Sequence, residues 1–119
     1  MIVLLAALAG GLGAVARFEV DAFVARHQRL SVPAGTVVVN VTACLLLGMV
    51  TGWVAVHGGS GAKAVLGVGF LGGYSTFSTA SVEAARLLRA GRPRAAVLHA
   101  TVMLLTSLAA AWAGLALTS

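Results

Sequence analysis

The order of hydrophobic and polar positions divides the chain into four long apolar segments joined by short polar connections. The segments run over about residues 2–23, 33–56, 64–88 and 95–117. Each is long enough to cross the hydrocarbon core of a bilayer as a helix, which takes about 20 residues. The pattern predicts an all-α integral membrane protein in which residues 1–119 form a single domain of four transmembrane helices.

The third segment differs from the others because it contains the glycine- and hydroxyl-rich stretch GFLGGYSTFSTASVE over residues 69–83. Backbone groups released from a helix cannot bond water inside lipid, so such a stretch must face protein, an ion or enclosed water. We therefore expect two half-helices joined by a break from Gly72 to Ser75.

Composition excludes several classes of protein. Nine per cent of the residues are charged and 60% are hydrophobic, with a mean hydropathy of +1.02, which is outside the range of soluble globular chains. Four short helices enclose little interior for a solute path, so we expect an oligomer. The net charge of +5 does not indicate nucleic-acid binding, because the arginines lie at the ends of apolar segments. A lone Cys44 provides neither a disulfide nor a thiolate zinc site within one chain.

The basic residues are distributed unequally between the two sides that four spans define. One side carries Arg26, Arg29, Arg86, Arg89, Arg92 and Arg94, with Arg17 near it. The other side carries only Lys63. Since cytoplasmic loops of membrane proteins are enriched in basic residues, we expect the arginine side to be cytoplasmic and both termini to lie outside.

A few polar residues inside the apolar segments are candidates for function, and each has a structural alternative. Arg17 is either a snorkelling anchor or a buried cation that attracts anions. Asn40 either makes an interhelical hydrogen bond or lines a solute path, and Thr36 one turn away favours the path. Glu83 either pairs with Arg86 at helical spacing or ends a polar track.

Three further residues have similar alternatives. Phe77, beside the expected break, contacts core or lipid, or turns its electropositive ring edge to a dehydrated anion. His99 and Ser107 are tolerated polar residues of the fourth segment or parts of the same path. The chain has three carboxylates and no set of acid, base and nucleophile, so we expect no enzyme.

Four motifs, in order, resemble those of the Fluc, or CrcB-type, fluoride channels of bacteria. They are GGLGAVARF (10–18), GTVVVNVTACLLLG (35–48), the stretch over 69–83, and RPRAAVLH (92–99) with Ser107. The resemblance covers nearly the whole chain. It implies an antiparallel dimer in the bacterial inner membrane with two pores along the interface. It also implies passive export of fluoride, which lowers the concentration and toxicity of fluoride in the cytoplasm.

The resemblance implies roles for single residues as well. A structural sodium ion, not transported, would lie at the dimer centre and be held by the backbone carbonyls of Gly72 and Ser75. The implied anion vestibule contains Arg17. The expected pore-lining residues, with Thr36 added for its position beside Asn40, are Asn40, Phe77, Thr79, Glu83, Ser107 and Thr36.

One departure from the family pattern bears on assembly. The pattern has a second Phe where this chain has Ala80, which removes one ring of a pore-lining pair. Homodimeric members insert in both orientations, which requires nearly balanced loop charges, whereas this chain is strongly biased. We therefore consider, as an alternative, a non-conducting or half-active subunit that pairs with a homologue of opposite charge bias.

Three other functions compete with a fluoride channel. A small multidrug exporter is also a dimer of four-helix subunits, but it needs a carboxylate in its first helix, and Met1 to Ala16 contains none. An assembly protein would not explain polar residues on three helices. A basic DNA-associated protein is suggested only by the pI of about 11.3.

Overall fold

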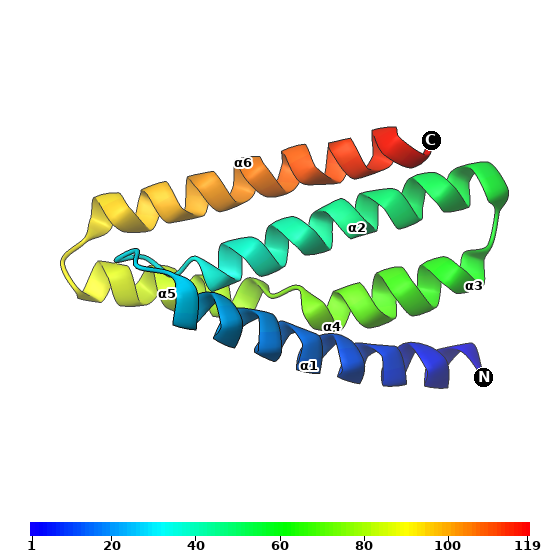
Figure 1. Ribbon diagram of the computed structural model, residues 1–119, viewed down its shortest axis with the longest axis horizontal. Coiled ribbons are helices and arrows are strands. Elements are labelled where there is room, and N and C mark those ends of the chain that lie inside the picture. Colours follow the sequence, from blue (N-terminus) through cyan, green and yellow to red (C-terminus); the bar gives the residue numbers. More distant parts are fainter.

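The computed structural model describes all 119 residues and contains helices but no strands (Figure 1). The three long helices are α1 (Ile2–His27), α2 (Gly35–His57) and α6 (Pro93–Thr118). Between α2 and α6 lie α3 (Ser60–Ala62), the π-helix η1 (Lys63–Leu71), α4 (Gly72–Tyr74) and α5 (Phe77–Arg89). The prediction of an all-α protein is confirmed.

The helices form an elongated bundle of 48 × 28 × 23 Å. Each of α1, α2 and α6 is long and apolar enough to cross a membrane. The elements from α3 to α5 follow one another along the same long axis (Figure 1). Together they make the remaining pass, which is the third in sequence. Leucines, valines and other large apolar side chains cover much of the outer surface, as expected where lipid is the solvent. The chain is a multi-pass membrane protein.

The pass from α3 to α5, third in sequence, becomes extended three residues after the expected start of the break. Gly72 and Gly73 are helical, and the extended residues are Ser75, with ψ 157°, and Thr76, with φ −150° and ψ 118°. Gly73 serves packing instead, because a Cβ on it would overlap the carbonyl oxygen of Gly10 on α1, whereas a Cβ on Gly72 would have room. The break is therefore at Ser75 and Thr76, and Gly73 lets two backbones approach closely.

Close glycine contacts also join α2 to α6. A Cβ on Gly48 would lie 2.2 Å from the carbonyl oxygen of Ala111, and one on Gly114 would lie 2.1 Å from that of Leu45. On α1, Gly13 makes the same kind of contact with the carbonyl oxygen of Phe70. The small residues of these helices are therefore the surfaces through which the bundle packs.

Replacing Gly114 with alanine is expected to destabilise the bundle, because α2 and α6 would have to separate to make room for the added carbon. Overpacking of this kind costs about 1–3 kcal/mol. We expect the thermal unfolding midpoint in detergent to fall by about 5 °C or more. The control is Ala116→Val, which adds carbon at an exposed position of the same helix. Equal midpoints for the two variants would contradict this account of the packing.

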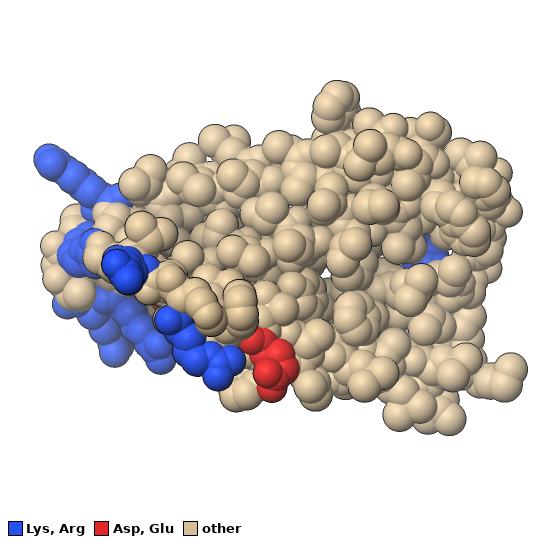
Figure 2. Space-filling model, in the orientation of Figure 1, with Lys and Arg blue, Asp and Glu red and all other residues tan.

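Charge is segregated along the bundle. The arginines gather at the end where α1 finishes, α5 finishes and α6 begins, whereas the opposite end shows a single basic residue (Figure 2). Both termini lie at that opposite end, together with the α2–α3 connection (Figure 1). The folded chain therefore keeps the charge asymmetry seen in the sequence.

Candidate functional site

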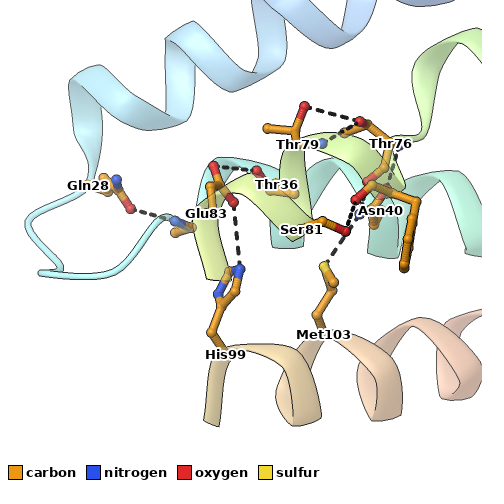
Figure 3. A network of polar contacts seen from close by, with 11 residues as sticks. Gln28, Thr36, Asn40, Thr76, Thr79, Ser81, Glu83, His99 and Met103 are labelled. Carbon is orange, nitrogen blue, oxygen red and sulfur yellow. Dashed lines mark hydrogen bonds and ion pairs between the residues drawn. The ribbon is translucent and has the colours of Figure 1, made fainter. Parts of the chain in front are cut away.

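Polar side chains from α2, α5 and α6 meet inside the otherwise apolar bundle (Figure 3). They lie around the extended residues Ser75 and Thr76, where the third pass is interrupted. The residues in contact are Thr36 and Asn40 of α2, Thr76, Thr79 and Glu83 of the third pass, and His99 and Met103 of α6.

At one end of this network, Thr36, Glu83 and His99 join three helices. The Thr36 hydroxyl donates a hydrogen bond of 2.8 Å to Glu83 Oε1, and His99 Nε2 lies 3.6 Å from Glu83 Oε2. Thr36 and His99 are buried. Glu83 Oε2, His99 Nε2 and Ser107 Oγ are buried without a hydrogen-bond partner. Buried polar atoms are normally paired, so these three have unused capacity to bind water or an ion.

Replacing Thr36 with valine is expected to destabilise the protein, because valine keeps the shape but leaves Glu83 Oε1 buried without its donor. Loss of one partner from a buried pair costs about 1–3 kcal/mol. The measurement is thermal unfolding in detergent, compared with Thr106→Val. The Thr106 hydroxyl bonds only carbonyls of its own helix and is exposed. A Thr36 variant as stable as the Thr106 variant would show that the Thr36–Glu83 bond is absent.

The Asn40 side chain is bonded to the backbone of the interrupted segment. Its Oδ1 accepts a 2.9 Å hydrogen bond from the Thr76 N–H, and its Nδ2 donates a 2.9 Å bond to the Thr76 carbonyl. Nδ2 also lies 3.4 Å from the sulfur of Met103. Thr76 in turn caps α5, since its Oγ1 accepts from the Thr79 N–H at 3.2 Å. Asn40 thus pairs both backbone polar atoms of Thr76, a residue outside the regular helix.

Two backbone carbonyls at the interruption are free of ordinary helical bonding. The Ser75 carbonyl accepts no hydrogen bond within the chain. The Thr76 N–H, which in a continuous helix would bond the Gly72 carbonyl, bonds Asn40 instead. Carbonyl oxygens released in this way are suitable ligands for a hard cation.

Phe77 begins α5 and points away from the protomer, with 85% of its surface exposed. A groove of about 460 Å³, which we call the Phe77 groove, runs beside it. Asn40, Ser75 and Phe77 line this groove together with Met103 and Ser107 of α6. It therefore presents an aromatic ring, an unpaired hydroxyl and a free carbonyl along one surface.

A second, smaller hollow lies on the α1 side of the network. This cavity of about 210 Å³, the Arg17 cavity, is lined by residues of α1, α2 and the start of α5. Its polar lining residues are Arg17, Asp21, Thr36, Thr76 and Thr79. Asp21 lies against the start of α2, because a Cβ on Gly35 would overlap its carboxylate. Thr36 and Thr76 line this cavity and also belong to the polar network, so the two features adjoin.

Comparison with known proteins identifies the family. Residues 4–115 match the family described as CrcB-like protein, Camphor Resistance (CrcB). This chain belongs to the CrcB-like family.

Several relatives of this CrcB-like chain carry a functional name. It is 47% identical to "Fluoride-specific ion channel FluC 1" of Leifsonia xyli subsp. xyli, over 97% of this chain and 85% of the relative. It is 46% identical to "Fluoride-specific ion channel FluC 2" of Cutibacterium acnes, over 100% and 98%. It is 40% identical to "Fluoride-specific ion channel FluC" of Pseudomonas putida, over 99% and 98%. The similarity spans nearly the full length of each protein.

The fold of this CrcB-like chain gathers the expected site residues into two adjoining places. Thr36 and Glu83 are bonded to each other, Thr79 is bonded to Thr76, and Asn40, Phe77 and Ser107 line the Phe77 groove. Arg17 lines the cavity on the α1 side, together with Thr36 and Thr79. The roles assigned to these residues remain predictions.

The sequence reasoning missed other members of the network. Thr76 could not be identified from the sequence, because its role depends on its backbone atoms. The role of His99 was left undecided, although its spacing of eight residues from Ser107 places both on one face of α6. The alternative that pairs Glu83 with Arg86 is wrong, because the only acid–base contact in the chain joins Glu83 to His99.

Proposed function

We propose that this chain is a subunit of a fluoride-specific channel that lets fluoride leave the bacterial cytoplasm passively. This export lowers the concentration and toxicity of fluoride in the cell. The observation that carries the proposal is the similarity over nearly the full chain to relatives named fluoride-specific ion channels.

The chemistry of the two hollows fits a small anion. Fluoride holds its water strongly, so a selective path must replace that water with donors and positive ring edges. Hydroxyls of Thr79 and Ser107 can donate, whereas that of Thr36 already donates to Glu83, and the Phe77 ring can present its edge. Arg17, at the α1 side, would raise the local concentration of anions at a vestibule. Glu83 would lie along the polar track beside Thr36.

An antiparallel dimer would complete the path. Phe77 is exposed on the protomer and the Phe77 groove is open, so a second subunit would enclose both. A structural sodium ion, held by the carbonyls of Gly72 and Ser75, would join the two interrupted helices at the centre. The free Ser75 carbonyl and the diverted Thr76 N–H support this choice of ligands.

The distribution of basic residues supports an orientation in the membrane and a type of partner subunit. The arginine-rich end would face the cytoplasm of the inner membrane, and both termini would face out. Because such a bias opposes insertion in both directions, the second subunit would be a homologue of opposite bias. Ala80 stands where the family pattern has its second Phe, so this chain would supply one ring, Phe77, to the Phe77 groove.

Fluoride efflux from liposomes tests this function. The chain is reconstituted alone and with a co-expressed homologue of opposite charge bias, and chloride efflux serves as the control. We expect fluoride efflux with the partner, little from the single chain, and no chloride efflux in either case. Robust efflux from the single chain would contradict the fixed-orientation heterodimer. Absence of fluoride efflux in both preparations would contradict the function itself.

A further inference from the structure

The contacts of Asn40 distinguish two ways in which it can serve the path. A side chain that binds a passing anion needs a free N–H, whereas a side chain that shapes the path acts through its neighbours. Both hydrogens of the Asn40 amide are engaged, one by the Thr76 carbonyl at 2.9 Å and the other by the Met103 sulfur at 3.4 Å (Figure 3). Its oxygen accepts from the Thr76 N–H.

The pairing with Thr76 is specific to asparagine. A primary amide offers one acceptor and one donor edge, which match the N–H and the carbonyl of a single residue. Aspartate lacks the donor, and serine is too short to reach both atoms. The contact with Met103 is of another kind, because a thioether is a weak acceptor and the side chain is flexible. The Thr76 contacts are therefore the ones that fix the orientation of the amide.

The segment held in this way contains the groups that the path needs. Thr76 lies between Ser75, whose carbonyl is free, and Phe77, whose ring lines the Phe77 groove. If the Thr76 peptide returned to helical geometry, its N–H would bond the Gly72 carbonyl and the Phe77 ring would turn about the helix axis.

We propose, on the basis of the function above, that Asn40 is a positioning residue. Its amide holds the Thr76 peptide in the extended form, which fixes the Phe77 ring and keeps the Gly72 carbonyl free.

Two leucine variants separate these roles. Asn40→Leu keeps the approximate shape of asparagine but removes both bonds to Thr76. Met103→Leu is the matched control, because it removes only the sulfur contact and leaves the Thr76 pairing intact. The first readout is the exchange rate of the Thr76 amide hydrogen, by NMR on threonine-labelled protein. The second is fluoride efflux from the assembly that passes fluoride.

For Asn40→Leu we expect the exchange rate of the Thr76 amide hydrogen to rise by about tenfold or more, which is the effect of losing one hydrogen bond. We expect fluoride efflux to fall by about the same factor. For Met103→Leu we expect Thr76 exchange to stay within about twofold of the wild type. Efflux has its own control, Thr106→Val, whose hydroxyl bonds only carbonyls of its own helix and for which we expect both quantities to stay within about twofold. If Asn40→Leu does not fold, Asn40→Ser replaces it, with the same expected result.

Three outcomes overturn the proposal. The first is a loss of efflux in Asn40→Leu with unchanged Thr76 exchange, and the second is faster exchange with unchanged efflux. The third is a rise of Thr76 exchange in Met103→Leu as large as that in Asn40→Leu, since the sulfur contact would then be what holds the amide. An assembly that passes no fluoride contradicts the proposed function, whereas Thr76 exchange is measured in any folded preparation and decides the pairing separately.

Discussion

Replacing Phe77 with leucine is expected to lower fluoride efflux by about tenfold or more, with little change in the stability of the protomer. The ring is 85% exposed, so its removal takes little contact from the folded chain. It is the only aromatic ring that lines the groove shared with Asn40 and Ser107. A desolvated contact with the edge of such a ring contributes up to about 1.5 kcal/mol, which corresponds to about tenfold in rate.

The matched control for Phe77→Leu is Phe23→Leu. Phe23 is also exposed, but it lies near the end of α1, stacked on His27 and away from the Phe77 groove. The control should keep wild-type efflux, and both variants should unfold at nearly the wild-type temperature. If Phe77→Leu conducts as well as Phe23→Leu, the anion does not pass the ring, and the groove is not the path.

The second large effect concerns orientation in the membrane. In a background with Cys44→Ala, a cysteine replacing the exposed Ser60 should be labelled from outside in nearly all molecules. Replacing four exposed arginines of the basic end with glutamine should lower the labelled fraction toward about one half, because the bias would be nearly removed. The four are Arg26, Arg29, Arg89 and Arg94.

The control for this experiment is Lys63→Gln, which removes the basic residue at the opposite end and should leave Ser60→Cys labelled from outside. Labelling of about half the molecules in the unaltered charge background would show that the chain inserts both ways. The need for a partner of opposite bias would then disappear.

The helices and their charge could be predicted from the sequence because they depend on local properties. Runs of about 20 apolar residues, ended by arginines, predict spans without knowledge of their neighbours. The shared face of Thr36 and Asn40 follows from their spacing of four. The position of the interruption could not be predicted in the same way. Glycines suggested a start at Gly72, but Gly73 is used for contact with α1.

The partners of the site residues could not be predicted, because they depend on how the helices pack. Asn40 bonds a peptide group 36 positions away, and Thr36 bonds a carboxylate 47 positions away. Nothing near either residue in the sequence signals these contacts. His99 is similar, since its nearness to Glu83 appears only when α5 packs beside α6. Sequence therefore indicates which residues are polar within the bundle, and the fold shows which atoms they hold.

The central claim is that the polar network of this bundle serves a path for fluoride and for no larger anion. The most direct measurement is the reversal potential across a planar bilayer that contains the assembly, with separate fluoride and chloride gradients. The account predicts a reversal potential that follows the fluoride gradient and does not move when chloride is changed. A potential that follows chloride or protons, or no current under a fluoride gradient, would contradict it.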